Sequence, residues 1–251
     1  MFVALTNDDG IMAAGLRGLY KALLDAGHTV SVIAPQTEQS ASGQAITVRI
    51  PLRAKRYEED NFTGTGIAGT PADCVKLGLS VLIKEKIDIV LSGINAGANT
   101  GPDILYSGTV AAAREAAGKG YPAMALSCAS FGQTDLAAYA RYSVTLMETI
   151  PWQRIPAGRV INVNFPDLPF EQCKGIKICP HAHVVWDDWY EERLDMHAVP
   201  YWWLNGKIPP ERVAPGTDRA LLSEGYITIS PLPCRCADEE GMLALRQCGL
   251  S

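Results

Sequence analysis

The sequence lacks the features of a membrane-spanning, secreted or nucleic-acid-binding protein. No uninterrupted apolar run approaches the roughly 18 residues that span a bilayer. The first basic residue is Arg17, so the positively charged start of a signal peptide is missing. The formal net charge of -5 has the wrong sign for a protein that neutralises the phosphates of DNA or RNA. We therefore expect a soluble cytoplasmic protein with no membrane and no nucleic-acid polymer among its partners.

Several motifs of common active sites are missing as well. The seven cysteines form no C-x-x-C pair and no zinc-site spacing, so we expect reduced and mostly buried thiols. Cys234 and Cys236 form a C-x-C pair, which we interpret as structural. His181 and His183 could bind a metal as a pair, but no third ligand is evident beside them. The chain contains no G-x-S-x-G segment, which argues against a serine hydrolase.

The chain does contain a regular alternation of apolar strands and amphipathic helices. Its 251 residues, 47% of them apolar, are enough to bury one large core. The expected strands cover 2–6, 28–34, 87–91, 121–127 and 159–164, and the expected helices cover 15–26, 71–84, 110–119 and 136–150. This alternation predicts an α/β fold with a Rossmann-like, doubly wound and mostly parallel sheet.

The pattern changes in the last third of the chain. Strands expected at 176–179 and 227–229 have no predicted helix between them, and 186–203 is crowded with aromatic residues. We expect a β-hairpin arm or a small antiparallel subdomain there. The predicted organisation is a Rossmann-like core over 1–165. Residues 166–251 are expected to form the arm and a C-terminal oligomerisation segment, packed on the core.

Oxygen-bearing side chains follow the ends of two predicted strands. Asp8 and Asp9 come directly after the first strand, and Asn95 follows the strand at 87–91. Because parallel strands end at the same edge of a sheet, these side chains should converge there. Two adjacent carboxylates repel each other in a cleft, and a hard divalent cation such as Mg²⁺, Mn²⁺ or Ca²⁺ is the simplest compensation. A plain turn is the competing interpretation of the Asn-Asp-Asp-Gly segment.

A second cluster has the character of a phosphate site. The glycine-rich segment 93–101 precedes Ser107, Gly108 and Thr109, which lead into a predicted helix. Glycine lets backbone amides approach an anion, and the helix N-terminus adds unpaired N–H groups and the positive end of a dipole. Ser107 and Thr109 could donate to phosphate oxygens or could simply cap the helix. A phosphate site beside a hard metal indicates phosphoryl chemistry.

Four separated segments, in matching order, resemble the signature segments of the SurE family of metal-dependent 5'-nucleotidases. These are residues 7–10, 69–75, 92–95 and 106–115, and 215–232 resembles the C-terminal segment of the family. The resemblance implies a Rossmann-like enzyme that hydrolyses nucleoside 5'-monophosphates, often 3'-monophosphates, and in some members short polyphosphate. It also implies one divalent metal ion per subunit, Mg²⁺ or Mn²⁺, and homodimers or homotetramers joined through the C-terminal arm.

The resemblance also assigns individual residues. It places the metal ligands at Asp8, Asp9, Ser40 and Asn95, and the catalytic role at Asp8 and Asp9. The phosphate contacts fall on Asn99, Ser107, Gly108 and Thr109. Many family members have glycine directly after the ligand serine, whereas here glycine stands at position 43, so Ser42 is an alternative to Ser40.

The sequence leaves the mechanism and some other classes of function open. Direct attack of water on phosphorus and formation of an aspartyl-phosphate are both compatible with paired aspartates. Residues 26–35 also resemble the opening of sugar-nucleotide glycosyltransferases, although 251 residues leave no room for their second domain. A nucleotide-binding sensor and a non-catalytic interaction protein are the remaining alternatives.

Overall fold

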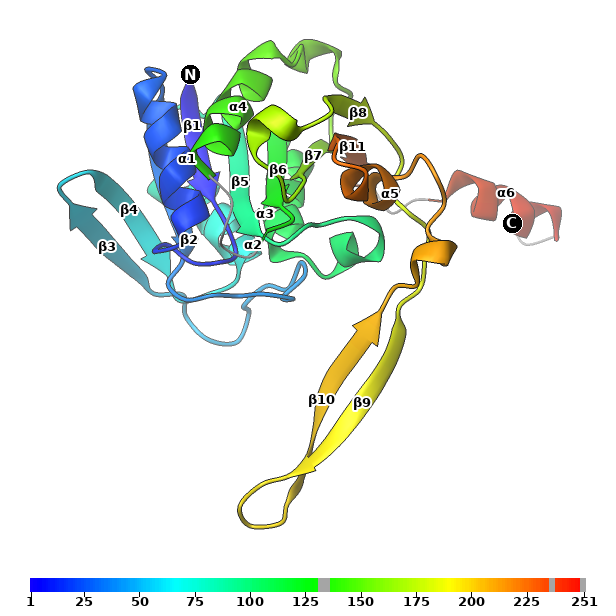
Figure 1. Ribbon diagram of the computed structural model, residues 1–251. Helices are drawn as coiled ribbons and strands as arrows, with labels where there is room; N and C mark the ends of the chain where they lie inside the picture. The colour runs from blue at the N-terminus through cyan, green and yellow to red at the C-terminus, as the bar shows by residue number, and fades with distance from the viewer. Residues whose placement is uncertain (131–135, 235–237, 249–251) are drawn as a thin grey trace.

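A nine-stranded sheet forms the centre of the computed structural model, which describes residues 1–130, 136–234 and 238–248. Its strands are β1 (Phe2–Thr6), β2 (Thr29–Pro35), β3 (Ala54–Glu59), β4 (Phe62–Ile67), β5 (Ile89–Ala96), β6 (Ala123–Cys128), β7 (Arg159–Phe165), β8 (Ile176–Ile178) and β11 (Ile227–Pro233). The strand order is β3-β4-β2-β1-β5-β6-β7-β11-β8, and the pairs from β4 through to β7 are parallel (Figure 1).

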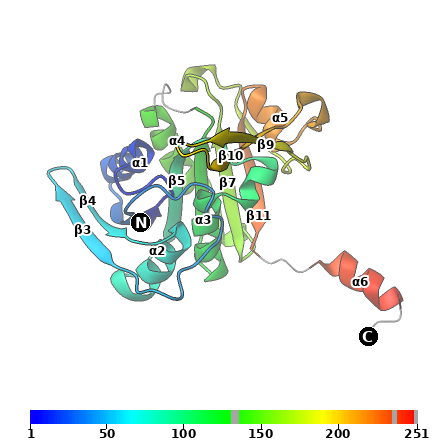
Figure 2. The same ribbon diagram turned by 90° about the horizontal axis from the view of Figure 1, so that it is seen from below.

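Helices cover both faces of this sheet. Helices α1 (Ala14–Asp25) and α4 (Leu136–Thr149) pack together on one face, and α2 (Pro71–Leu77) and α3 (Gly108–Gly118) pack on the other (Figure 2). Each face has its own apolar core, in which the sheet contributes residues such as Leu91 and Val163 to the first and Ala4 and Val90 to the second. The predicted Rossmann-like, doubly wound sheet is confirmed.

The sheet reverses its winding direction between β1 and β5. The chain runs from β1 through α1 to β2 on one side, and α2 later carries it across to β5 on the other. In such folds the crevice at the carboxyl ends of the two strands is the usual ligand site. Asp8 and Asp9 directly follow β1, and Asn95 lies at the end of β5, so these predicted site residues lie at the carboxyl ends of the two strands where the winding reverses.

The start of α2 follows directly from its sequence. The Thr70 hydroxyl accepts a hydrogen bond from the backbone of Asp73, whose carboxylate accepts one from the backbone of Thr70, with Pro71 at the first helical position. The helix was expected to reach about residue 84. The α-helix ends at Leu77 instead, and a wider helical turn, Gly78–Leu82, completes the segment.

The β3–β4 hairpin is an element that the hydrophobic pattern does not predict. Strand β3 has the sequence AKRYEE and is mostly exposed, and β4 carries two glycines. An edge strand with charged side chains has no apolar face to mark it, although those charges protect a sheet edge from pairing with another chain.

In the C-terminal third, two strands extend the central sheet and the other elements lie outside it. Strand β11 pairs antiparallel with β7 and parallel with β8, and the short helix α5 (Asp218–Ser223) contacts β11. The remaining elements are the hairpin strands β9 (Asp187–Leu194) and β10 (Pro200–Lys207), the helix α6 (Glu239–Gln247), and short helical turns at Gly101–Leu105, Trp152–Arg154, Phe170–Gln172 and Pro210–Arg212.

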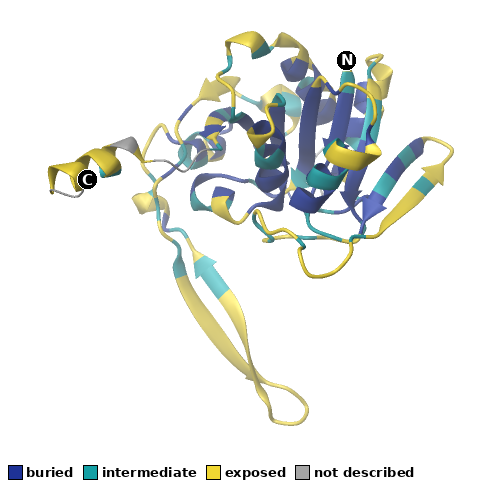
Figure 3. Ribbon diagram, turned by 180° about the vertical axis from the view of Figure 1, so that it is seen from behind, coloured by how far each residue is buried: buried dark blue, intermediate teal, exposed yellow. Residues whose placement is uncertain are grey.

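The β9–β10 hairpin, here called the arm, is the predicted hairpin arm. It projects from the body of the molecule, and so does α6 (Figure 1). Both are exposed along almost their whole length (Figure 3). Residues 166–251 were expected to pack on the core; β8 and β11 belong to the central sheet, whereas the arm and α6 extend away from it (Figure 1). A functional division at residue 165 stays a prediction.

Two further findings concern the whole described chain. None of the helices in the described ranges combines the length and the apolar character needed to cross a membrane. None of the six cysteines in these ranges forms a disulfide, and three of them, Cys74, Cys128 and Cys179, are buried. Cys236 lies outside the described residues.

Candidate active site

Three loops meet at the carboxyl ends of β1 and β5. The loop after β2 is tied to the end of β1, because the backbone N–H of Gln39 donates to the Asp8 carbonyl at 2.8 Å. The same loop reaches the segment before α3, where the N–H of Gly43 donates to the Tyr106 carbonyl at 2.9 Å. The loop after β2 therefore lies beside both the end of β1 and the start of α3.

Asp8 is buried at the centre of this meeting point. Its carboxylate accepts a hydrogen bond from the Thr109 hydroxyl, which lies in the first turn of α3. Burial raises the pKa of Asp8 above its ordinary value, and the hydrogen bonds from Thr109 oppose that shift. A buried carboxylate at a helix N-terminus also gains from the positive end of the helix dipole.

Asp9 is less buried than Asp8, and it lies beside the negative charge of that residue. Burial raises the pKa of its carboxyl to about 6, and the neighbouring charge of Asp8 adds to the rise. The backbone N–H of Ala96, at the end of β5, donates to Asp9 at 3.3 Å and gives partial compensation. Two acidic groups are thus held together with too few positive partners among the described residues, which suits a bound cation.

The two candidate serines of the loop after β2 have different surroundings. The Ser40 hydroxyl is exposed and donates to the Glu38 carboxylate at 2.7 Å. The Ser42 hydroxyl is buried and has no hydrogen-bond partner in the described part of the chain. A Cβ at Gly108 would lie 2.9 Å from both the Ser42 Oγ and the Asp8 Oδ2, so glycine is required for these groups to meet at the start of α3.

These oxygens form a donor set that fits a hard divalent cation. Asp8 and Asp9 supply negative charge, and the unpaired Ser42 hydroxyl supplies a neutral oxygen. The Asn95 side-chain nitrogen donates to the Gly97 carbonyl at 2.8 Å, which leaves its oxygen as the atom that could bind a cation. No cluster of three or more His, Cys, Asp or Glu occurs within the described residues, so a metal here would depend on such neutral oxygens.

The predicted phosphate residues have different surroundings. The Ser107 hydroxyl caps α3 by accepting from the Val110 N–H at 3.1 Å, which is the simple capping role. Asn99 is buried and donates through its side chain to Ser127 at 2.8 Å. Gly108 and Thr109 lie beside Asp8 in the first turn of α3. The roles of these residues in phosphate binding stay predictions.

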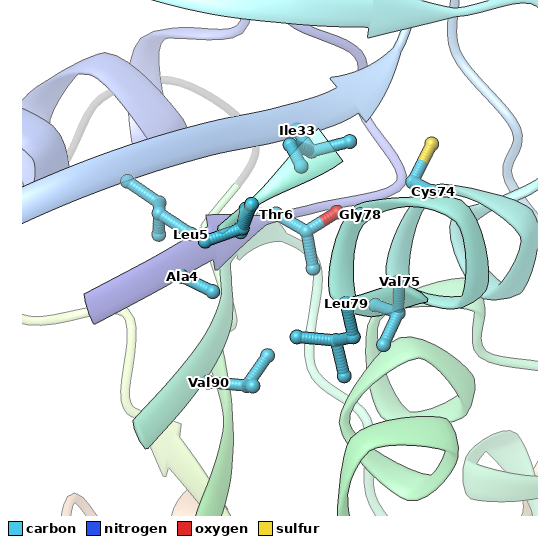
Figure 4. Close-up of a pocket in the computed structure, with 10 residues that line it drawn as sticks. Ala4, Leu5, Thr6, Ile33, Cys74, Val75, Gly78, Leu79 and Val90 are labelled. Atoms are coloured by element: carbon cyan, nitrogen blue, oxygen red, sulfur yellow. The ribbon is translucent and has the colours of Figure 1, made fainter. Parts of the chain in front are cut away.

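A small cavity lies between α2 and the sheet (Figure 4). It is lined mainly by apolar side chains, including Ile33, Val75 and Val90, and its volume is about 10 Å³. A space of that size holds one water molecule at most. It is a packing defect beneath α2 and not a substrate site.

Known proteins match this chain over most of its length. The family described as Survival protein SurE matches residues 3–188. The 5'-nucleotidase SurE of Nitratidesulfovibrio vulgaris (strain DSM 19637 / Miyazaki F) is 59% identical over 242 residues, covering 96% of this chain and 90% of the relative. That of strain DP4 is 58% identical over 245 residues, covering 98% of each. The chain belongs to the SurE family.

A solved SurE structure has the same fold. The crystal structure of the Sure protein from Aquifex aeolicus superposes with a TM-score of 0.85 at 31% identity, covering 99% of this chain and 100% of the other. The resemblance that the sequence motifs indicated is therefore confirmed at the level of family and fold.

Sequence reasoning missed two asparagines that hold the backbone of Asn99, one of the predicted phosphate residues. The Asn164 side chain, on β7, accepts from the Asn99 N–H at 2.7 Å and donates to the Asn99 carbonyl at 3.1 Å. Asn162, two residues earlier, donates to the same carbonyl at 2.9 Å. The Asn-x-Asn spacing inside a predicted buried strand was the available signal, since it places two amides on one face near the strand end.

Proposed function

We propose that this SurE-family protein hydrolyses nucleoside 5'-monophosphates to nucleoside and phosphate. The observation that carries the proposal is the contact between the buried Asp8 carboxylate and Thr109, because it sets acidic groups beside a helix N-terminus suited to phosphate. The name 5'-nucleotidase of relatives at 58–59% identity supports the nucleotide substrate. Nucleoside 3'-monophosphates and short polyphosphate are further substrates under the same proposal.

The proposed enzyme uses one divalent cation per subunit, Mg²⁺ or Mn²⁺. Asp8, Asp9, Asn95 and one serine would hold it. When bound, the cation would polarise phosphoryl oxygens and offset negative charge that develops on them. The resemblance to the family supports Ser40 as the serine, whereas the buried and unpaired hydroxyl supports Ser42.

Asp8 and Asp9 are the proposed catalytic groups. In the direct route one carboxylate orients a water molecule and accepts its proton as the water oxygen bonds to phosphorus and the nucleoside oxygen leaves. In the covalent route a carboxylate oxygen bonds to phosphorus as the bond from phosphorus to the nucleoside oxygen breaks and the nucleoside leaves, and water later hydrolyses the aspartyl-phosphate to phosphate and free carboxylate. In either route the phosphate would be held by the four predicted phosphate residues, Asn99, Ser107, Gly108 and Thr109.

Association and location complete the proposal. The arm carries exposed aromatic side chains, including Trp189, Trp202 and Trp203, which are 50%, 54% and 58% exposed. Large exposed apolar surfaces commonly mark contacts between proteins. We infer a homodimer or homotetramer joined through the arm and the C-terminal segment, acting in the cytoplasm.

The decisive experiment measures phosphate release after metal removal. The protein is treated with EDTA, and Mg²⁺ or Mn²⁺ is restored in the presence of 5'-AMP, 5'-GMP, 5'-CMP, 3'-AMP or tripolyphosphate. We expect activity to disappear with EDTA and to return with metal. Folded protein that releases no phosphate with any metal and substrate would contradict the proposal and favour a nucleotide-binding sensor.

Two variants then separate the candidate serine ligands. If Ser42 binds the cation, Ser42→Ala raises the concentration of metal needed for half-maximal activity, and Ser40→Ala leaves it near the wild-type value. The opposite result assigns the ligand to Ser40. Quenching the reaction and searching for a phosphorylated aspartate distinguishes the covalent route from direct attack of water.

A further inference from the structure

Asp103 connects the phosphate-site turn to the base of the arm. Its backbone carbonyl accepts from the N–H groups of Tyr106 and Ser107, each at 3.1 Å, so it shapes the turn that leads into α3. Its carboxylate accepts from the Trp186 indole nitrogen at 2.9 Å and from the Arg219 guanidinium. One residue thus contacts the site on one side and the C-terminal third on the other.

Trp186 belongs to the base of the arm. It directly precedes β9, and its ring lies against Gly206 of β10, where a Cβ would come within 3.0 Å of the ring. The Arg219 guanidinium lies over the same indole, 5.9 Å from the ring centroid. Asp103, Trp186 and Arg219 therefore form one interlocked group, which we call the latch.

A second connection holds the same loop just before the latch. Asp218 is fully buried, and its carboxylate accepts from the Gly101 N–H at 2.9 Å and from the Ala182 N–H at 2.8 Å. Gly101 begins the short helical turn that contains Asp103. The backbone of residues 103–107 is also held by the hydrogen bond from Gly43 to the Tyr106 carbonyl, and the latch adds the side-chain contacts of Asp103.

We propose that Asp103, Trp186 and Arg219 are positioning residues that set the phosphate affinity of the site by holding the turn before Ser107, Gly108 and Thr109. This inference rests on the proposed function, because it assumes that this turn binds phosphate. In this proposal the latch acts through the backbone of the turn, which the Asp103 carbonyl shapes. Its loss should therefore weaken binding of a phosphate group in the substrate and in the transition state alike.

The test replaces Trp186 by phenylalanine. Phenylalanine keeps an aromatic ring at this position but lacks the indole N–H, so the hydrogen bond to Asp103 is lost. We expect the KM for 5'-AMP and the inhibition constant of inorganic phosphate to rise about three- to tenfold, which corresponds to one hydrogen bond. The kcat should stay within about twofold of the wild type, since uniform binding is lost.

Trp152→Phe is the matched control. The Trp152 indole also donates one hydrogen bond at 2.9 Å, to the Met147 carbonyl, but it lies beside the amino-terminal end of β7, at the opposite edge of the sheet. We expect this variant to keep the wild-type KM and inhibition constant. Equal changes in the two tryptophan variants would show a general effect on the fold and overturn the proposal.

A double-mutant cycle tests whether the effect of Trp186→Phe depends on Asp103. In an Asp103→Ala background, Trp186→Phe should cause no further loss of phosphate affinity, because its partner is already gone. An unchanged phosphate affinity in Trp186→Phe, or a fall in kcat alone, overturns the latch even if Asp103→Ala does not fold.

Calorimetric titration with inorganic phosphate separates failure of the latch from failure of the proposed function. If the wild type binds phosphate without hydrolysing 5'-AMP, the nucleotidase proposal fails. The phosphate dissociation constants of the variants then still test the latch. If the wild type hydrolyses 5'-AMP and Trp186→Phe matches it in every constant, the latch alone fails. A wild type that neither binds phosphate nor hydrolyses 5'-AMP overturns both.

Discussion

At the scale of single residues, the clearest consequence of the site is an unfavourable charge on Asp9. Its folded pKa of about 6 exceeds the ordinary 3.8, so the folded protein binds more protons than the unfolded chain between about pH 4 and 6. Stability must therefore fall as the pH rises through that window. We expect Asp9→Asn to stabilise the metal-free protein by about 1 to 3 kcal/mol at pH 7, and the gain to vanish near pH 4.

Urea unfolding in EDTA at the two pH values measures this effect. Asp60→Asn is the control, because Asp60 is exposed in the turn between β3 and β4. It should change the free energy of unfolding by less than about 0.5 kcal/mol. A destabilised Asp9→Asn protein at pH 7 would contradict the charge argument.

Thr109 carries a second prediction at this scale. Thr109→Val keeps the shape of the side chain and removes the hydroxyl that donates to Asp8. Because a hydrogen bond to a charged group contributes about 1.5 to 3 kcal/mol, we expect kcat/KM to fall about 10- to 100-fold. Thr109→Ser should restore most of the activity, whereas Thr145→Val, on the exposed side of α4, should leave kcat/KM unchanged.

The sequence predicts which residues meet at the site better than it predicts how they are oriented. Asp8 and Asp9 are evident from their place after an apolar strand. The choice between Ser40 and Ser42 is not, because it depends on loop geometry. Ala41, between the two serines, has a φ of 57°, a conformation that residues other than glycine seldom adopt. No pattern in the sequence signals that turn.

At the scale of elements, β7 supports the site through its amides. Valine is a favourable residue in a β-strand, but Asn164→Val removes both hydrogen bonds to the Asn99 backbone. The buried N–H of Asn99 is then left unpaired. We expect a loss of about 2 to 4 kcal/mol in the free energy of unfolding, together with a loss of activity. Asn205→Val, in the partly exposed strand β10, is the matched control and should be nearly neutral.

The hydrophobic pattern of each strand explains why some elements were predicted and others were missed. Strands β1 and β5 to β7 are buried on both faces, so continuous apolar runs reveal them. Strand β3 is polar, and its partner β4 contains two glycines, so neither has a clear pattern. The partners of Asn162 and Asn164 depend on contacts across 63 to 65 residues of chain, which strand periodicity does not contain.

At the scale of the whole molecule, the arm is the feature that needs an explanation. Tyr190 and Leu204 are directly paired across the hairpin and are 67% and 61% exposed. If the arm joins subunits, replacing both by serine should remove apolar contact area and lower the molecular mass measured by light scattering. Val81→Ser, at another exposed apolar position, should leave the mass unchanged. A double variant with the wild-type mass would exclude these side chains from the interface.

Assembly of the site has a consequence for the order of events during folding. Contacts that complete it join Asp8 to Thr109 across 101 residues and Gly101 to Asp218 across 117. Bringing such distant segments together is slow, because the entropy of closing long loops is lost before the contacts form. During refolding we expect circular dichroism to recover before phosphate release does. Catalytic competence would then be among the last properties that the chain acquires, and a partly folded molecule would already be rich in helix yet inactive.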